Sequence, residues 1–140
     1  MRRYEFIDHT ADAAVKAYGQ NIEEAFASAA LAMFDIITGG AEIEPKERTQ
    51  FAVESIDREG LLVRFLSELI VLHEGEGRVF SDFRVSFEDW FQLTAEMGSE
   101  PFDPERHAQG IQVKGVSYYM MEIVDGTPDE PAHVQVLFDI

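Results

Sequence analysis

The order of apolar and polar residues divides the chain into two kinds of segment. In some stretches apolar and polar residues alternate, which is typical of strands with one buried face, and in others apolar residues recur every three or four positions, which is typical of amphipathic helices. Short groups of Gly, Pro, Asn and Asp separate these stretches. The alternating stretches predict seven strands, at residues 4–7, 13–19, 49–56, 79–85, 90–97, 113–124 and 132–139.

Two longer segments carry the helical period together with helix boundary signals. Asn21 is placed to cap the first helix, with Glu24 three residues later reaching back to the amide of Asn21, and Gly39 ends it. Asp57 caps the second helix, which ends in the segment before Gly77. The predicted apolar stripes consist of Ile22, Phe26, Ala29, Ala30, Met33, Phe34 and Ile37 in the first helix and of Leu61, Leu62, Phe65, Leu66, Leu69, Ile70 and His73 in the second.

Two shorter features complete the expected secondary structure. The strands at 79–85 and 90–97 are expected to pair as a hairpin around Glu88 and Asp89. A short helical turn is expected before His107, with Asp103 as its cap and Pro104 at its first position.

These elements predict an α+β fold. Each long helix has one apolar stripe, so both helices are expected to pack on one face of a sheet. The expected architecture is a two-layer sandwich, in which about seven strands form a mostly antiparallel, mixed sheet with two helices on one face. No repeat or linker interrupts the chain, and residues 1–140 are therefore expected to form a single domain.

Composition narrows the classes of function. The chain has 27 acidic and 11 basic residues, a net charge of −16, which disfavours direct binding to nucleic acid. Such a surface suits hard cations, basic protein partners, or a saline cytoplasm that favours acidic surfaces. The chain has no cysteine, which excludes disulfides and thiolate zinc sites. The first residues lack the apolar region of a secretory signal, and no apolar run approaches the roughly 20 residues of a spanning helix, so a cytoplasmic, non-membrane protein is expected.

The segment Asp8-His9-Thr10-Ala11-Asp12 concentrates titratable groups between the first two predicted strands. At the other end, the Asp139 side chain and the α-carboxylate of Ile140 lie one residue apart. If the strands that carry these ends are neighbours, the oxygen atoms could form one pocket for a hard divalent cation such as Ca²⁺ or Mg²⁺. Oxygen ligands of this kind argue against zinc or copper.

Other interpretations of these residues stay open. Asp8 could instead cap the turn by accepting backbone hydrogen bonds, whereas Asp12 stands among alanines and gains little from such capping. Lys114, the lone cation in an apolar segment, could face the acidic pocket or the solvent, and Gly115 beside it indicates a close approach or a bulge. Asp8 and Asp12 could also serve as an acid–base pair of a metal-dependent hydrolase with His9 as base. No phosphate-binding glycine loop, nucleophile elbow or helical histidine pair supports an active site of that kind.

Segments along the whole chain resemble one known family in the same order. They are Asp8-His9-Thr10-Ala11-Asp12, Ala17-Tyr18-Gly19, Glu23-Glu24-Ala25-Phe26, Ala29-Ala30-Leu31-Ala32-Met33-Phe34, Ile43-Glu44-Pro45, Leu61-Leu62, Phe65-Leu66-Ser67-Glu68-Leu69, Pro101-Phe102-Asp103-Pro104-Glu105-Arg106-His107, Val113-Lys114-Gly115-Val116-Ser117-Tyr118 and Phe138-Asp139-Ile140. Together they resemble the archease family. The chain departs from the family pattern at Ile111-Gln112, where relatives usually have Thr-Glu, and at Tyr119, where histidine is frequent.

The resemblance implies a function without enzymatic activity. Archeases assist the GTP-dependent RNA-splicing ligase that joins tRNA halves, by speeding its guanylylation and allowing multiple turnover. They are described as binding a divalent metal, typically calcium, with Mg²⁺ or Mn²⁺ as alternatives here. By position, the implied ligands are Asp12, Asp139 and Ile140, with Asp8, His9 and Lys114 as neighbours. The alternative function is a generic acidic chaperone or scaffold for RNA-modifying enzymes.

Overall fold

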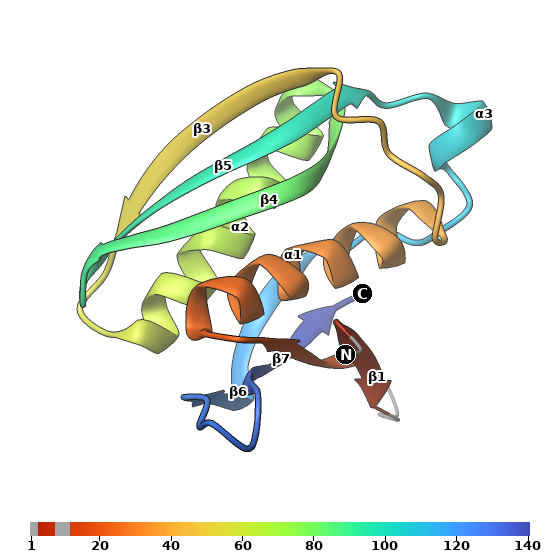
Figure 1. Cartoon of the computed structure of the whole chain (residues 1–140). Helices are drawn as coiled ribbons and strands as arrows, with labels where there is room; N and C mark the ends of the chain where they lie inside the picture. The colour runs from red at the N-terminus through yellow and green to blue at the C-terminus, as the bar shows by residue number, and fades with distance from the viewer. Residues whose placement is uncertain (1–2, 8–11) are drawn as a thin grey trace.

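The computed structural model describes residues 3–7 and 12–140 and shows an α+β fold (Figure 1). The elements in chain order are β1 (Tyr4–Ile7), β2 (Ala13–Gly19), α1 (Ile22–Thr38), β3 (Glu47–Glu54), α2 (Arg58–Glu76), β4 (Arg78–Asp89), β5 (Gln92–Pro101), α3 (Pro104–His107), β6 (Gly115–Val124) and β7 (Ala132–Asp139). Among the described residues, no helix is both long and apolar enough to cross a membrane.

The strands form two antiparallel sheets. One has the order β1-β2-β7-β6 and the other the order β3-β5-β4. The two long helices lie between them in Figure 1: α1 contacts β2 and β7 of the first sheet and β4 of the second, while α2 contacts β6 of the first and all three strands of the second. The core is therefore built from the helices and from the inner face of each sheet.

The α+β class, the antiparallel pairing and the seven strands confirm the prediction for the described part of the chain. The difference is that the strands are divided between two sheets. In α1, Ala25, Ser28, Ala32 and Thr38 are buried in addition to the predicted stripe. These small side chains widen the buried arc of the helix, so that two sheets can approach it from different sides.

The helix boundaries follow the predicted caps. The Asn21 Oδ1 atom accepts a hydrogen bond from the Glu24 amide at 2.9 Å, and the Asp57 Oδ1 atom accepts one from the Gly60 amide at 2.7 Å. Glu24 accepts from the amide of Gln20 at 3.3 Å, whereas the sequence predicted the amide of Asn21. Gly39 ends α1 with a left-handed φ of 70°, a conformation that glycine adopts without steric cost.

The β4–β5 hairpin is confirmed, but the prediction that Trp90 and Phe91 belong to a strand is wrong. β4 extends to Asp89 and β5 starts at Gln92, so that both aromatic residues form the turn. The Asp89 Oδ1 atom accepts a hydrogen bond from the Phe91 amide at 2.7 Å, which closes a side-chain-supported turn. The apolar character of the two residues resembles that of a strand, although both side chains are exposed.

Candidate functional site

Two acidic residues lie at the same end of the four-stranded sheet. β2 and β7 are antiparallel neighbours, and their register pairs Ala13 with Phe138. Asp12 and Asp139 are the next residues on these two strands, so they follow the last pair of the ladder. β7 pairs with β2 rather than with β1, and this pairing places Asp12 next to the end of β7 that carries Asp139.

β6 forms the other side of this end of the sheet. Gly115 lies opposite Asp139 in the β6–β7 ladder, and the Lys114 amide donates a hydrogen bond to the Asp139 carbonyl oxygen at 2.7 Å. A Cβ atom at Gly115 would lie 3.4 Å from Oδ2 of Asp139. The glycine thus leaves one flank of the Asp139 carboxylate clear of side-chain atoms. The 3.4 Å distance is an ordinary van der Waals contact, so it does not show a close backbone approach at Gly115, and the bulge of β6 lies further along, between Ser117 and Glu122.

The carboxylates of Asp12 and Asp139 are not neutralised within the described ranges, 3–7 and 12–140. Neither forms a hydrogen bond or an ion pair there, and Lys114, which is exposed, forms no ion pair either. Asp12 is half-buried, Asp139 is exposed, and Ile140 is 38% exposed. Two like charges without a counter-charge favour binding of a cation or of a basic group. We call Asp12, Asp139 and Ile140, with Gly115 beside them, the acidic tip.

The donor set of the acidic tip consists of oxygen atoms, which fits a hard cation. The described residues contain no group of three or more His, Asp or Glu side chains placed to hold a metal ion, so the tip supplies two side-chain carboxylates and the main-chain oxygen atoms of Ile140. Asp8 and His9, which the sequence also predicted near this site, lie outside the described residues.

Exposed aromatic side chains lie on the same edge strand as Gly115. Tyr118 and Tyr119 are 60% and 64% exposed in the bulge of β6, where Met120 has a positive φ of 60°. The Gln135 side-chain amide donates to the Met120 carbonyl oxygen at 2.9 Å and holds the bulge against β7. A positive φ is uncommon for a residue other than glycine, so this shape of the edge depends on specific contacts.

A second charged cluster, which the sequence did not predict, is buried at the C-terminal end of β5. The Glu100 carboxylate is 1% exposed and accepts hydrogen bonds from Arg106 at 2.9 and 3.2 Å and from the Glu44 amide at 2.7 Å. His107 Nε2 lies 3.2 Å from the same carboxylate, and His107 Nδ1 accepts from the Asp103 amide at 2.8 Å. His107 is therefore the Nε2–H tautomer and donates to Glu100.

These contacts decide the charge state of Glu100. Burial by itself would raise the pKa of this carboxyl, but the hydrogen bonds from Arg106, the Glu44 amide and His107 lower the pKa to about 2. Both carboxylate oxygens are occupied by protein donors, which leaves no position for a ligand. The cluster therefore braces α3 and the segment before β3 and is not a candidate active site.

Comparison with known proteins supports the resemblance that the sequence shows to one family. The sequence description of the Archease protein family matches residues 4–140. The chain belongs to the archease family. It is 41% identical to Protein archease of Pyrococcus abyssi over 143 residues, with all of both chains covered. It is 40% identical to Protein archease of Methanothermobacter thermautotrophicus over 128 residues, which cover 89% of this chain and 91% of the relative.

Two solved structures share the archease fold. The solution structure of protein 1598 of Methanobacterium thermoautotrophicum is 34% identical, covers 100% of both chains and superimposes with a TM-score of 0.70. The crystal structure of an archease from Thermotoga maritima, described as a possible chaperone, is 19% identical and has a TM-score of 0.63 over 100% of this chain and 98% of the other. The Thermotoga structure supports the fold of the chain.

Proposed function

We propose that this archease is a non-enzymatic activator of the GTP-dependent RNA-splicing ligase and acts through a divalent cation at the acidic tip. The observation that carries the proposal is the β2–β7 register, which brings Asp12 and Asp139 to the same end of the sheet. Membership of the archease family supports this proposal, because the ligase is the partner that the resemblance to the family implies.

The chemistry of the residues supports a role for the tip at a phosphate-handling site. Asp12, Asp139 and Ile140 would hold the cation, with Ca²⁺ as the first candidate and Mg²⁺ or Mn²⁺ as alternatives. A bound divalent cation neutralises phosphate charge in nucleotidyl transfer. Gly115 leaves space beside Asp139, and Asp139 is exposed, so a partner could reach the tip directly.

The charge of the whole chain supports a partner with a basic site. A ligase that binds RNA and GTP exposes basic groups to phosphates, and a protein with a net charge of −16 would be attracted towards them. The same charge disfavours binding of RNA by this protein itself.

The test is guanylylation of the ligase from the same organism, followed with labelled GTP in the presence and absence of this protein. Wild type should accelerate the reaction and permit multiple turnover, and Asp12→Asn should lose at least about tenfold of the stimulation, as expected for a lost metal ligand. Asp129→Asn, a similar change in the β6–β7 connection, is the matched control and should stimulate normally. Full stimulation by Asp12→Asn would contradict the proposal.

Two further measurements separate the alternatives. Calorimetric titration with Ca²⁺ should show weaker binding to Asp139→Asn than to wild type, because the substitution removes one of the proposed carboxylate ligands. A generic scaffold predicts that Asp139→Asn and Asp12→Asn leave stimulation unchanged. A hydrolase that uses Asp8 and Asp12 predicts turnover of a phosphate ester by this protein alone.

A further inference from the structure

The end of the β3-β5-β4 sheet near the β4–β5 turn exposes large apolar side chains. Ile56 is 88% exposed, Trp90 63% and Phe91 53%. The Ser55 amide donates to the Phe91 carbonyl oxygen at 2.9 Å, so that the β3–α2 connection and the β4–β5 turn are joined at this point. Apolar side chains gathered in this way on a surface are typical of protein interaction sites.

Trp90 is held in its exposed position by a stack that reaches into the core. The guanidinium carbon of Arg58 lies 4.0 Å from the centre of the Trp90 ring and 4.6 Å from that of Phe87. Phe87 in turn packs edge-on against the buried Phe26, with ring centres 5.2 Å apart. Arg58 Nε is buried and has no hydrogen-bond partner among the described residues, so the contribution of this side chain comes from stacking. The exposed indole is therefore packed against Arg58 on one of its faces.

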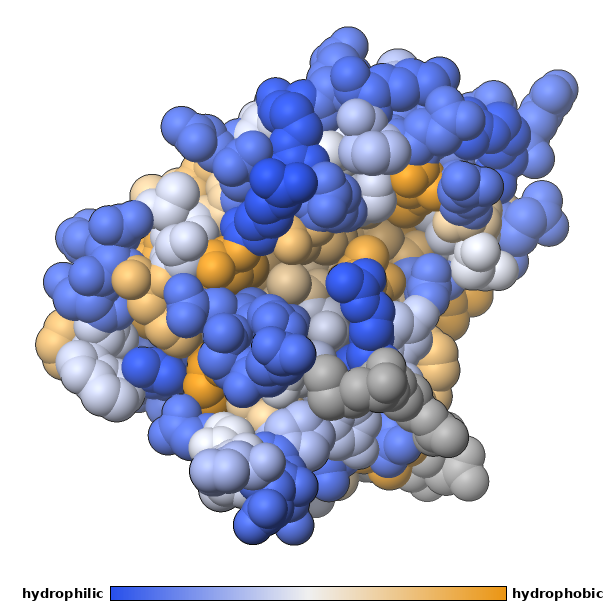
Figure 2. Space-filling model, viewed as in Figure 1, coloured by the Kyte–Doolittle hydropathy of each residue, from blue (hydrophilic) through white to orange (hydrophobic). Residues whose placement is uncertain are grey.

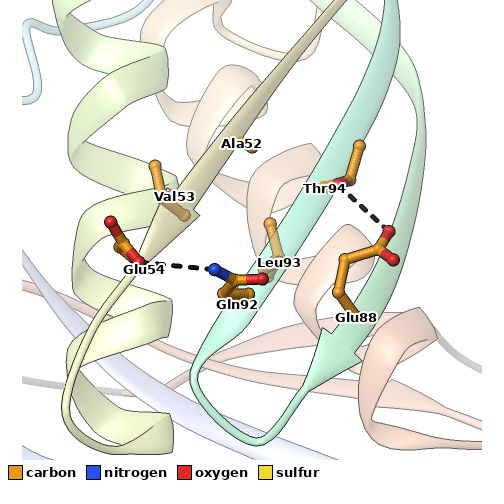
Figure 3. Close-up of a pocket in the computed structure, with 7 residues that line it drawn as sticks. All are labelled: Ala52, Val53, Glu54, Glu88, Gln92, Leu93 and Thr94. Atoms are coloured by element: carbon orange, nitrogen blue, oxygen red, sulfur yellow. Dashed lines mark hydrogen bonds between the residues drawn. The ribbon is translucent and has the colours of Figure 1, made fainter.

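A cavity of about 260 Å³ lies on the β3-β5-β4 sheet near the β4–β5 turn, lined by residues of all three strands (Figure 3). Glu54 of β3 and Glu88 of β4 stand on its two sides, and Gln92 and Leu93 of β5 lie between them in Figure 3. Gln92 donates to Glu54 at 3.4 Å and Thr94 donates to Glu88 at 3.3 Å, which orients both carboxylates. We call Ile56, Trp90 and Phe91, together with Glu54 and Glu88, the hairpin-end surface.

The charge around the hairpin-end surface selects the partner. Asp57, Glu59 and Asp89 add three more acidic residues next to it, and the only basic residue of these adjoining segments is Arg58, which is stacked between two rings. Carboxylates in this number repel phosphate groups and would also repel a second copy of the chain. A basic segment with apolar residues beside it satisfies both the carboxylates and the exposed rings.

We propose that the hairpin-end surface binds a basic segment of a protein partner that also carries apolar residues. Lys or Arg side chains of this segment lie between Glu54 and Glu88, and its apolar residues pack around Trp90 and Phe91. This inference rests on the proposed function, because the partner used to test it is the RNA ligase. In Figure 1 the β4–β5 turn and the C-terminus lie at different sides of the protein, so the hairpin-end surface is separate from the acidic tip. The hairpin-end surface supplies affinity, whereas the acidic tip supplies stimulation.

The experiment measures two quantities with the purified ligase: its affinity for this protein by calorimetry, and the maximal stimulation of guanylylation at saturating concentration. Trp90→Ser with Phe91→Ser should weaken binding by about tenfold or more, as expected for central aromatic contacts. Maximal stimulation should be unchanged. Ile56→Ser should weaken binding by roughly threefold, and since Ile56 is 88% exposed this change does not disturb the packing of the core.

Matched controls come from elsewhere on the surface. Val71→Ser changes an apolar residue on α2 that is 60% exposed and should bind as wild type does. Glu54→Gln with Glu88→Gln should reduce the salt dependence of binding, whereas Asp129→Asn with Glu130→Gln, an equal change of charge in another loop, should leave it as in wild type.

The outcomes separate this inference from the proposed function. Affinities of the Ile56 and Trp90/Phe91 variants within twofold of wild type would overturn the inference, even when wild type stimulates the ligase. Binding by wild type without any stimulation would contradict the proposed function. The affinities of the same variants for the ligase would still test the docking surface. Absence of binding by wild type would overturn both.

Discussion

Acidic side chains in this archease differ in whether the protein supplies them with partners. Glu100 receives hydrogen bonds from Arg106, the Glu44 amide and His107, whereas Asp12 and Asp139 receive none within the described ranges. A satisfied carboxylate stabilises the fold, and one without partners is available to a ligand. The sequence pointed to Asp12 and Asp139 through the grouping of charges at the chain ends. It did not point to Glu100, whose partners come together only in the folded chain.

The lowered pKa of Glu100 predicts a pH dependence of stability. Because the pKa is about 2 in the folded protein and 4.5 for the free group, ionised Glu100 stabilises the fold fully above pH 4.5, and this contribution is lost as the pH falls towards 2. Glu100→Gln should therefore lower the free energy of unfolding at pH 7 by about 2 kcal/mol, mainly through hydrogen bonds lost in a buried site. Urea denaturation at several pH values between 7 and 2 should show this difference shrinking below pH 4.5.

Lys46 provides the control for this measurement. Its ammonium lies 3.7 Å from Glu100 but its side chain is 55% exposed, so Lys46→Gln should change the free energy of unfolding by less than about 0.5 kcal/mol. A difference between wild type and Glu100→Gln that is equal at pH 7 and pH 2.5 would contradict the assignment of the pKa.

At the scale of elements, the sequence predicted helices and strands where local rules decide the structure. The caps at Asn21 and Asp57, the glycine at the end of α1 and the strands β1, β2 and β7 lie where the pattern placed them. The local pattern was misleading at Trp90 and Phe91, because exposed aromatic residues in a turn have the same hydropathy as buried ones in a strand. The local pattern also did not predict the division of the strands into two sheets, since strand pairing depends on contacts between distant segments.

The cap of α1 gives a prediction at this scale. Asn21→Ala removes the acceptor of the Glu24 amide and should lower the free energy of unfolding by about 1 kcal/mol. Asn21→Ser keeps an acceptor at the same position and should recover most of this loss. Thermal or urea denaturation of the three proteins measures both differences, and equal stability of Asn21→Ala and wild type would contradict the role of the cap.

At the scale of the whole molecule, the excess of acidic over basic residues is the dominant property of the surface. Figure 2 shows polar residues over much of one face, with apolar residues exposed in the hollow between them. With 27 acidic and 11 basic residues, carboxylates repel one another across the surface of the folded protein. This repulsion opposes compaction of the chain, and dissolved salt weakens it by screening.

Stability should therefore rise with ionic strength in the absence of divalent cations. Raising KCl from about 0.02 to about 0.3 M in the presence of a chelator should increase the midpoint of thermal unfolding by about 3 °C, which corresponds to roughly 1 kcal/mol for a domain of this size. NaCl should act equally, because the effect comes from screening. A midpoint that is constant or falls over this range would show that surface repulsion does not limit the stability.

The stack of Arg58 on Trp90 has a practical consequence. Trp90 is the only tryptophan in the sequence and is 63% exposed at the turn of the hairpin. Its emission spectrum is consequently an intrinsic optical reporter of one defined place on the molecule. A ligand that covers the indole should shift the emission maximum to shorter wavelengths, whereas Ca²⁺ added alone should leave the emission maximum unchanged.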